Sequence, residues 1–404
     1  MNKLKICIIT PIIYPVPAIK GGAVEGLVEL LVRINEIEDK MDLTIVSLYE
    51  KEAEKSAKNY VNSKFIFIKR GDIWDKIWSS KFFVYINKAW IKLKNDYLFA
   101  MPFVKRIWKK IATSDFDYYI LEGGGDYYNF GYLHKKISKD KLLVHFHGEV
   151  AGDEAINNWF GRYIAVSNYI GRRLICNGKL DVERLCILQN CFDRSIIADN
   201  KPIVKRNLRK KYGIEPEDFV YVYWGRLVPA KGVLEAVKAF KKVSVNQGNA
   251  KLLIVGNATF GYETKSEYDK KLEKLCCDNN VDKKVKFTGF IPHNEMGSVL
   301  GICDVGLIPS IWDEPAALTV FEGLANKLPI ITTSVGGTPE IIKNGYNGIL
   351  IKWSKDFVDD IANAMDKLYN SEELREHLSS NAYTTAMKYT DENFYNNFVD
   401  ILKS

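Results

Sequence analysis

The sequence lacks the features that would assign it to a membrane-spanning or secreted class. No stretch approaches the run of about 18 apolar residues that a membrane-spanning helix needs. The opening apolar run, Ile6 to Tyr14, is interrupted by Thr10 and Pro11, and no small-residue cleavage site follows it. The seven cysteines form no CxxC pair and no zinc-binding spacing, which favours reduced, mostly buried thiols. Low-complexity segments and short repeats are also missing. We therefore expect a protein of the reducing cytoplasm.

A strong charge of one sign is also missing. The 404 residues include 57 Lys+Arg and 50 Asp+Glu, which gives a net charge of +7. Of these, 30 basic and 24 acidic residues lie before position 201, so the first half carries +6 and the second half +1. The composition is that of a globular protein, and the length predicts two domains.

Apolar runs of strand length alternate with helix-length amphipathic stretches along most of the chain. The runs lie at 5–10, 43–48, 65–68, 118–121, 142–146 and 163–167, and again at 219–224, 251–256, 285–290, 304–310 and 328–333. This pattern is typical of parallel strands that are covered on both faces. Two such series predict two doubly wound α/β domains with a junction near the polar stretch 200–207.

One segment, Lys76 to Lys110, interrupts this alternation. It holds nine basic residues, one acidic residue and nine interleaved aromatic residues. Helices of this kind can pack their aromatic side chains onto a sheet and leave the lysines in solvent. They can also lie in an anionic membrane interface. No nucleic-acid-binding motif is present, and no nucleic-acid partner is expected.

Two motifs in the second half carry chemistry. In the loop GRLVPAKG, Arg226 and Lys231 stand just before a helix begins. Two cations and helix-terminal amides in one small volume suit a diphosphate, although a solvated loop is the alternative. In EPAALTVFE, Glu314 and Glu322 are eight positions apart. That separation is about two helical turns, and it lets two carboxylates contact different parts of one elongated ligand.

The combination of these motifs resembles a known family, the retaining glycosyltransferases of family 4, a group 1 type found in bacterial polysaccharide synthesis. The resemblance covers nearly the whole chain and implies the GT-B fold, in which two Rossmann-like domains face a central cleft. By this resemblance Glu314 faces the donor sugar and is a catalytic residue, and Glu322 faces the nucleotide ribose. Backbone amides near Leu318 and Thr319 would hold phosphate oxygens, and Ile291, after FTGF, lies where the family seats the base.

The first half supplies further residues by the same resemblance. Gly22 in a GG pair matches a donor-binding loop of the first domain, and His147 matches the catalytic histidine near the transferred sugar. Strand alternation puts His145 on the same side as His147, and a core role fits His145 better. Asn190 in ILQNCFD is a candidate cleft residue, with Cys191 where the family carries a glycine.

The resemblance also implies domain boundaries. The acceptor domain is expected at 1–199, the nucleotide-sugar donor domain at 200–387, and a helix that crosses back to the first domain at 388–404. Ala316 and Ala317 stand where many members of the family carry an aromatic residue and a glycine, so this departure concerns the shape of the sugar pocket.

The implied function is metal-independent, retaining transfer of a hexose-type sugar from a nucleotide-diphosphate donor, with UDP favoured. The acceptor would be a saccharide or lipid-linked saccharide in cell-surface polysaccharide or glycoconjugate assembly, at the cytoplasmic side of the membrane. No cofactor and no metal are expected, because Arg226, Lys231 and helix dipoles would stabilise the departing diphosphate. Asp115 and Asp117 form a D-x-D that is better explained as carboxylates at a strand entry. The alternatives are transfer to a protein-bound glycan, a nucleotide-sugar 2-epimerase on the same fold, and a non-catalytic partner of another transferase.

Overall fold

The computed structural model describes residues 3–11, 13–71, 77, 80, 82, 85–86, 89–90, 102–124, 127–198, 201–257 and 266–404. It divides the chain into two units: Met1–Gln189 together with Asp391–Ser404, and Asn190–Thr390. The boundaries expected from the sequence lie at 199/200 and 387/388. Much of the basic aromatic segment 76–110 lies outside the described residues.

The first unit is built on a parallel seven-stranded sheet with the order β3-β2-β1-β4-β5-β6-β7. Its strands are β1 (Leu4–Ile9), β2 (Met41–Leu48), β3 (Ser63–Ile68), β4 (Tyr118–Gly123), β5 (Leu142–Phe146), β6 (Arg162–Ala165) and β7 (Leu185–Ile187). The central strands β1, β4 and β5 are almost wholly buried. Burial on both faces explains why these runs are continuously apolar and do not alternate with polar residues.

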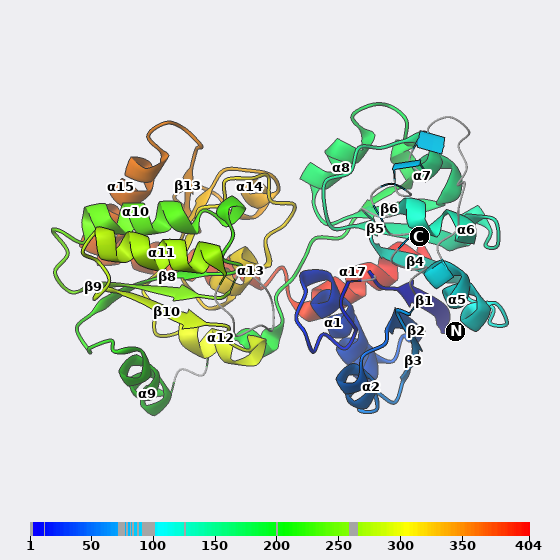
Figure 1. Ribbon diagram of the computed structural model, residues 1–404, viewed down its shortest axis with the longest axis horizontal. Coiled ribbons are helices and arrows are strands. Elements are labelled where there is room, and N and C mark those ends of the chain that lie inside the picture. The colour runs from blue at the N-terminus through cyan, green and yellow to red at the C-terminus, as the bar shows by residue number, and fades with distance from the viewer. Residues whose placement is uncertain are drawn as a thin grey trace. The chain divides into compact units, whose positions relative to one another are not determined.

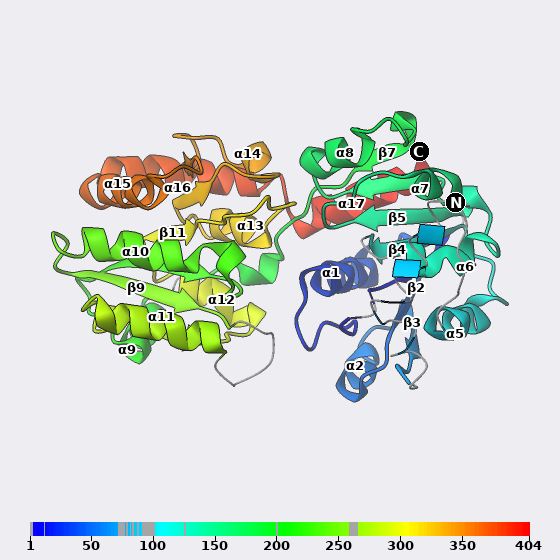
Figure 2. The same ribbon diagram turned by 45° about the horizontal axis from the view of Figure 1, so that its top comes forward.

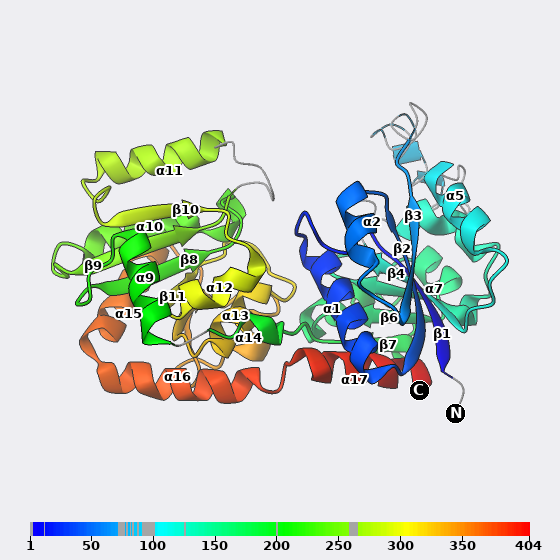
Figure 3. The ribbon, with the colours of Figure 1, turned by 90° about the horizontal axis from the view of Figure 1, so that it is seen from below.

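Helices lie on both sides of this first sheet, as Figure 3 shows for α1 on one side and α5 on the other. The described α-helices of this unit are α1 (Ala23–Glu38), α2 (Lys51–Ala57), α5 (Pro102–Ile111), α6 (Gly131–His134), α7 (Glu154–Trp159), α8 (Asn168–Ile175) and α17 (Asp391–Lys403). The last of these comes from the opposite end of the chain and lies beside α1 (Figures 1 and 2). The hydroxyl of Tyr395 on α17 donates to Asn35 Oδ1 on α1 at 2.6 Å.

The second unit holds a parallel six-stranded sheet with the order β10-β9-β8-β11-β12-β13. Its strands are β8 (Phe219–Trp224), β9 (Ala250–Val255), β10 (Val285–Gly289), β11 (Val305–Ile308), β12 (Ile330–Thr333) and β13 (Ile349–Ile351). Its described α-helices are α9 (Pro202–Tyr212), α10 (Val233–Val243), α11 (Glu267–Asp278), α12 (His293–Leu300), α13 (Leu318–Ala325), α14 (Thr338–Ile341), α15 (Phe357–Asn370) and α16 (Glu372–Ala386).

The second sheet separates two hydrophobic cores. Tyr221 and Tyr223 of β8 face the core under α10, α11 and α15, whereas the alternate residues Val220, Val222 and Trp224 face the core under α9, α12, α13 and α16. Figure 1 shows α10 and α11 on one side of these strands and α12 on the other. The predicted pair of doubly wound, Rossmann-like α/β domains is confirmed. Within the described parts of the chain, none of the helices combines the length and apolar character needed to cross a membrane.

Candidate functional site

The second sheet has one topological switch point, between β8 and β11. From β8 the chain builds the sheet outward through β9 and β10, and it then returns to the other side of β8 with β11, β12 and β13. In an open parallel sheet, ligands bind outside the carboxyl ends of the strands at such a point. The loops that follow β8 and β11 hold Arg226, Lys231 and Glu314.

Glycines line the carboxyl edge next to this point. Gly225, Gly256 and Gly289 stand at the ends of β8, β9 and β10, and all three have positive φ angles, of 135°, 126° and 72°. A Cβ atom on Gly256 would lie 2.0 Å from the carbonyl oxygen of Gly225. Only glycine fits there, so this edge presents backbone at which a ligand can approach closely. The repetition of a glycine at the end of three successive strands is a sequence signal that could have identified this edge.

The loops after β8 and β11 pack directly against each other. The amide of Ile311 donates to the carbonyl of Ala230 at 2.9 Å. Gly232 has a φ of 70°, and a Cβ atom there would stand 1.7 Å from the carbonyl oxygen of Pro309. The 3₁₀ turn Pro229–Lys231 is thereby held against the start of the Glu314 loop.

This packing brings Lys231 and Glu314 into contact. Lys231 Nζ lies 2.6 Å from Glu314 Oε1, and the hydroxyl of Ser310 donates to the same oxygen at 2.6 Å. The Glu314 side chain is only 4% exposed, so the lysine compensates a carboxylate that would otherwise be costly to bury. Lys231 also lies 5.5 Å from the ring centre of the half-exposed Trp312. Ser310 and Trp312 were not identified from the sequence.

The N-terminus of α13 opens beside this pair. Ala317 is the N-cap residue and makes no side-chain capping bond. The first amide of this turn with a backbone partner is that of Val320, which donates to Ala317. The amides of Leu318 and Thr319 are thus the orphan donors of the helix start, where the helix dipole favours an anion. The Thr319 methyl group lies 3.8 Å from where a Cβ atom on Gly225 would stand, so these amides and the glycine loop border the same space.

Glu322 lies further along α13 and is buried. The indole nitrogen of Trp224 donates to Glu322 Oε2 at 2.9 Å, and His293 Nδ1 is 3.8 Å from Glu322 Oε1. Burial raises the pKa of the Glu322 carboxyl, while the nearby His293 and the Trp224 hydrogen bond act in the opposite direction. Trp224 and His293 are contacts that the sequence reasoning missed, because they depend on which side of β8 and α12 faces α13.

The remaining candidates of the second unit differ in burial. The Arg226 side chain is exposed, on the loop after β8. Ile291 is buried between β10 and α12. Asn190 is buried, and its Nδ2 donates to the carbonyl of Ala316 at 2.9 Å, next to the Glu314 loop. Its Oδ1 is buried without a hydrogen-bond partner in the described part of the chain.

Two candidates, Gly22 and His147, belong to the first unit. Its switch point lies between β1 and β4. Gly22 precedes α1 with a φ of 109°, and the carboxylate of Glu25 occupies the space where a Cβ atom of Gly22 would be. His147 follows β5, and its Nε2 lies 2.7 Å from Oε2 of Glu122 on β4. His145 Nδ1 lies 3.0 Å from the same oxygen.

The cluster of Glu122, His145 and His147 is the one group of potential metal ligands found among the described residues. Ligands of one tetrahedral zinc, bound at about 2.0 Å, stand about 3.3 Å apart. The 2.7 Å between His147 and Glu122 is instead the spacing of a direct hydrogen bond.

Asp115 and Asp117 stand just before β4, and both accept hydrogen bonds from neighbouring strands and loops. Lys141 Nζ donates to Asp115 Oδ1 at 2.9 Å, and the Lys5 amide donates to Asp117 Oδ2 at 2.7 Å.

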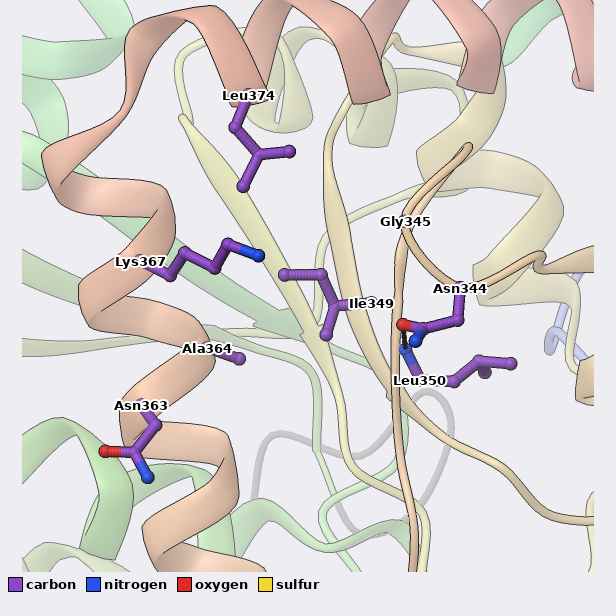
Figure 4. A pocket seen from close by; sticks show the side chains of 8 residues that line it. All are labelled: Asn344, Gly345, Ile349, Leu350, Asn363, Ala364, Lys367 and Leu374. Carbon is purple, nitrogen blue, oxygen red and sulfur yellow. Dashed lines mark hydrogen bonds between the residues drawn. The ribbon is translucent and has the colours of Figure 1, made fainter.

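A pocket elsewhere in the second unit contains none of the candidates (Figure 4). It lies between β13 and the helices α15 and α16, and the side chain of Lys367 points into it. Asn344 Oδ1 accepts a hydrogen bond from the amide of Leu350 on its far wall.

Comparisons with known proteins relate the second unit to a family model. Residues 204–385 match the family model described as Glycosyl transferases group 1. The matched residues lie within the second unit. An uncharacterized glycosyltransferase of Methanocaldococcus jannaschii, MJ1607, is 32% identical over 200 residues, which are 49% of this chain and 48% of that protein. The chain thus spans about half the length of this relative.

Two further proteins match over more of the chain. The lipopolysaccharide 1,2-N-acetylglucosaminetransferase of Salmonella typhimurium is 22% identical over 333 residues, which are 80% of this chain and 82% of that protein. The crystal structure of Anabaena Alr3699/HepE in complex with UDP-glucose has a TM-score of 0.75 at 17% identity, over 99% of both chains. At that identity the likeness concerns the fold alone, which is the GT-B fold with two Rossmann-like domains that the family resemblance implied.

Proposed function

We propose that this protein is a retaining glycosyltransferase that moves a sugar from a UDP-sugar to a hydroxyl of a saccharide acceptor in cell-surface polysaccharide or glycoconjugate assembly. One observation carries the proposal: Lys231, Glu314 and the orphan amides of α13 converge at the switch point of a glycosyl transferases group 1 domain. Two of the proteins named above support the choice of donor and acceptor: the Anabaena structure is a complex with UDP-glucose, and the Salmonella protein is named a lipopolysaccharide 1,2-N-acetylglucosaminetransferase.

The diphosphate of the donor would lie between the α13 N-terminus and the cations after β8. Lys231 has three N–H donors and gives one to Glu314, so the other two remain for phosphate oxygens. Arg226, exposed on the same loop, adds a fork of donors. When the sugar–phosphate bond breaks, negative charge grows on the leaving oxygen. These donors stabilise that charge more than they stabilise the ground state, which lowers the barrier.

The carboxylates would orient the two ends of the donor. Glu314 Oε1 is held by Lys231 and Ser310, so the carboxylate has a fixed direction toward the sugar hydroxyls. Glu322, hydrogen-bonded to Trp224, would accept the ribose hydroxyls, with Ile291 beside the base. With Glu314 as an orienting group, the acceptor attacks on the face that the diphosphate leaves, and the configuration is retained.

Arg226 and Lys231 provide the test of the phosphate site. Replacing either by methionine should reduce kcat/KM by about 10²–10³, because each removes a cation from the developing charge. The matched control is Lys238→Met, which changes an exposed lysine on α10 and should leave the rate unchanged. Products from a panel of UDP-sugars would be identified by mass spectrometry, with and without a saccharide acceptor.

Two outcomes would contradict the proposal. Near-normal transfer by both variants would reject the phosphate assignment, and sugar conversion without an acceptor would indicate an epimerase. The same assay with EDTA should give an unchanged rate, because we propose that Arg226, Lys231 and α13 take the place of a metal ion.

We further propose peripheral contact with anionic membranes through α5. Phe103, Val104, Ile107 and Ile111 of this helix are buried, whereas Lys105, Lys109 and Lys110 are exposed. A cationic face of this kind is attracted to anionic lipid headgroups, and salt screens the attraction.

Vesicle co-sedimentation tests this membrane contact. The protein should sediment with phosphatidylglycerol vesicles at low salt, and the double variant K105E/K109E should not. The control K210E/K211E reverses two exposed charges on α9 and should sediment like the unchanged protein. Equal sedimentation of both double variants, or none of the unchanged protein, would reject the contact.

A further inference from the structure

The cluster of Glu122, His145 and His147 occupies the carboxyl edge of the first sheet. Glu122 on β4 stands directly opposite His145 on β5 in the strand register. Because successive side chains alternate, His147 projects to the same side as His145, and the two ring centres are 4.1 Å apart. The side chains are 1%, 2% and 9% exposed in the order Glu122, His145 and His147. The cluster is therefore buried, with His147 as its outermost member.

The proton of the bond between His147 and Glu122 belongs to the histidine. Burial alone would raise the pKa of Glu122, but the two adjacent imidazoles outweigh burial and lower this pKa to about 2. An ionised carboxylate can only accept hydrogen bonds, so the 2.7 Å contact is a bond from Nε2–H of His147 to Oε2 of Glu122.

The other ring nitrogen of His147 remains available. Nδ1 has no hydrogen-bond partner within the described residues, and it is not among the buried polar atoms closed off from solvent. Burial, followed by the neighbouring His145, lowers the pKa of His147, although Glu122 acts in the opposite direction. A neutral imidazole that is protonated at Nε2 carries a lone pair at Nδ1 and accepts a hydrogen bond there.

We propose that Glu122 is a positioning residue that holds His147 as the Nε2–H tautomer, so that Nδ1 accepts a hydrogen bond from a substrate hydroxyl at this edge of the first sheet. The nature of the substrate rests on the proposed function, whereas the tautomer does not. In the Nδ1–H tautomer, Nδ1 of His147 would donate a hydrogen bond. Because Glu122 holds the proton on Nε2, Nδ1 accepts a hydrogen bond instead, and the hydroxyl groups of a sugar can donate one.

The surrounding charges agree with this arrangement. Glu25 on α1 is the other acid in electrostatic contact with Glu122, and burial raises its pKa to about 7, with the charge of Glu122 adding to the effect. Glu122 is thus the ionised acid of the cluster, and its negative charge is the reason why the histidine proton faces inward.

Nitrogen-15 NMR of histidine-labelled protein tests the tautomer without any substrate. The chain has five histidines, and the His147 signals are assigned as those that disappear in His147→Asn. In the unchanged protein the neutral ring should carry its proton on Nε2. In Glu122→Gln the Nε2–H signature should weaken or move to Nδ1, because the amide can donate to Nε2.

The matched control is Glu149→Gln. This substitution removes a carboxylate two residues from His147 that pairs with Arg173, and the tautomer should not change. An Nδ1–H tautomer in the unchanged protein would overturn the proposal, and this measurement does not depend on whether Glu122→Gln folds. A retained Nε2–H signature in a folded Glu122→Gln would overturn it as well.

Kinetics test the contact with substrate. Glu122→Gln should lower kcat by about tenfold, the equivalent of one lost hydrogen bond. KM for the nucleotide sugar should change less than kcat, because Lys231, Glu314 and Glu322, which we propose to hold most of the donor, lie in the second unit. A purely structural defect would lower the folded fraction without altering the tautomer of the folded protein. An altered tautomer together with an unchanged kcat would overturn the substrate contact, and absence of transfer by the unchanged protein would reject the proposed function alone.

Discussion

At the scale of single residues, Glu25 combines an unfavourable environment with a place at the functional edge of the first unit. Its carboxylate lies in the first turn of α1 and folds back over Gly22. Burial raises its pKa from 4.5 to about 7, and the negative charge of Glu122 contributes to the shift. An ionised Glu25 therefore destabilises the folded state.

This shift predicts a pH-dependent stability. Between about pH 4.5 and 7 the folded protein binds a proton that the unfolded chain has released, so stability is lost as the pH rises through this range. The variant Glu25→Gln has no such carboxyl group and does not lose this stability. The difference in free energy of unfolding between the variant and the unchanged protein should therefore shift by about 2 kcal/mol in favour of the variant from pH 5.5 to pH 8. Denaturant unfolding at both pH values measures it. The control Glu52→Gln, at an exposed position of α2, should show the same dependence of stability on pH as the unchanged protein. If Glu25→Gln also showed that dependence, the raised pKa of Glu25 would be contradicted.

How far the site could be predicted from sequence depends on whether its contacts are local. Lys231 and Glu314 stand in recognisable motifs, and the structure brings them within 2.6 Å. Glu122 was missed because an acidic residue at the end of a strand has no distinctive pattern. Its pairing with His147 requires β4 and β5 to be neighbours in register, and the order of strands in a sheet is not encoded in any local stretch.

At the scale of elements, the loop between β8 and α10 depends on one glycine. Gly232 has a φ of 70°, and its α-carbon faces the carbonyl of Pro309 so closely that a Cβ atom would be 1.7 Å from the oxygen. The loops after β8 and β11 can pack together only with glycine at this position, and this packing sets the distance between Lys231 and Glu314.

Gly232→Ala should therefore separate the two loops. We expect a loss of stability of about 2 kcal/mol or more from the left-handed backbone and the clash. The affinity for UDP should fall by about tenfold or more, because the phosphate donors are displaced. Calorimetric titration with UDP and denaturant unfolding would measure both. Gly248→Ala, where a Cβ atom meets open space, should change stability by no more than about 0.5 kcal/mol. Equal stability and equal UDP affinity of Gly232→Ala and Gly248→Ala would show that the close approach of Gly232 to the Pro309 carbonyl is unimportant.

The elements themselves were largely predictable. The apolar run expected at 5–10 corresponds to β1 at Leu4–Ile9, and the run at 219–224 corresponds to β8. Both runs are buried on two faces, which produces a strong local signal. The three-residue strands β7 and β13 lie at the sheet edges and were not predicted, because partly exposed short strands leave little apolar pattern.

At the scale of the whole molecule, the first unit is assembled from both ends of the chain. Residues 391–404 belong with residues 1–189, although the entire second unit lies between them in sequence. On α17 the side chains of Phe394, Tyr395, Phe398, Val399 and Leu402 are buried. The hydrogen bond from Tyr395 to Asn35 ties α17 to α1, so the last helix completes the core of the first unit.

This arrangement predicts that a substitution near the C-terminus destabilises the unit that contains the N-terminus. Phe398→Ala removes a fully buried ring and should cost about 3–5 kcal/mol. Amide hydrogen exchange should then become faster in α1 and β2, while β9 and β10 of the second unit keep their protection. Asn397→Ala, at an exposed position of the same helix, should leave exchange in both units unchanged. Faster exchange confined to β9 and β10 would mean that α17 stabilises the unit it follows in sequence rather than the one whose core it completes.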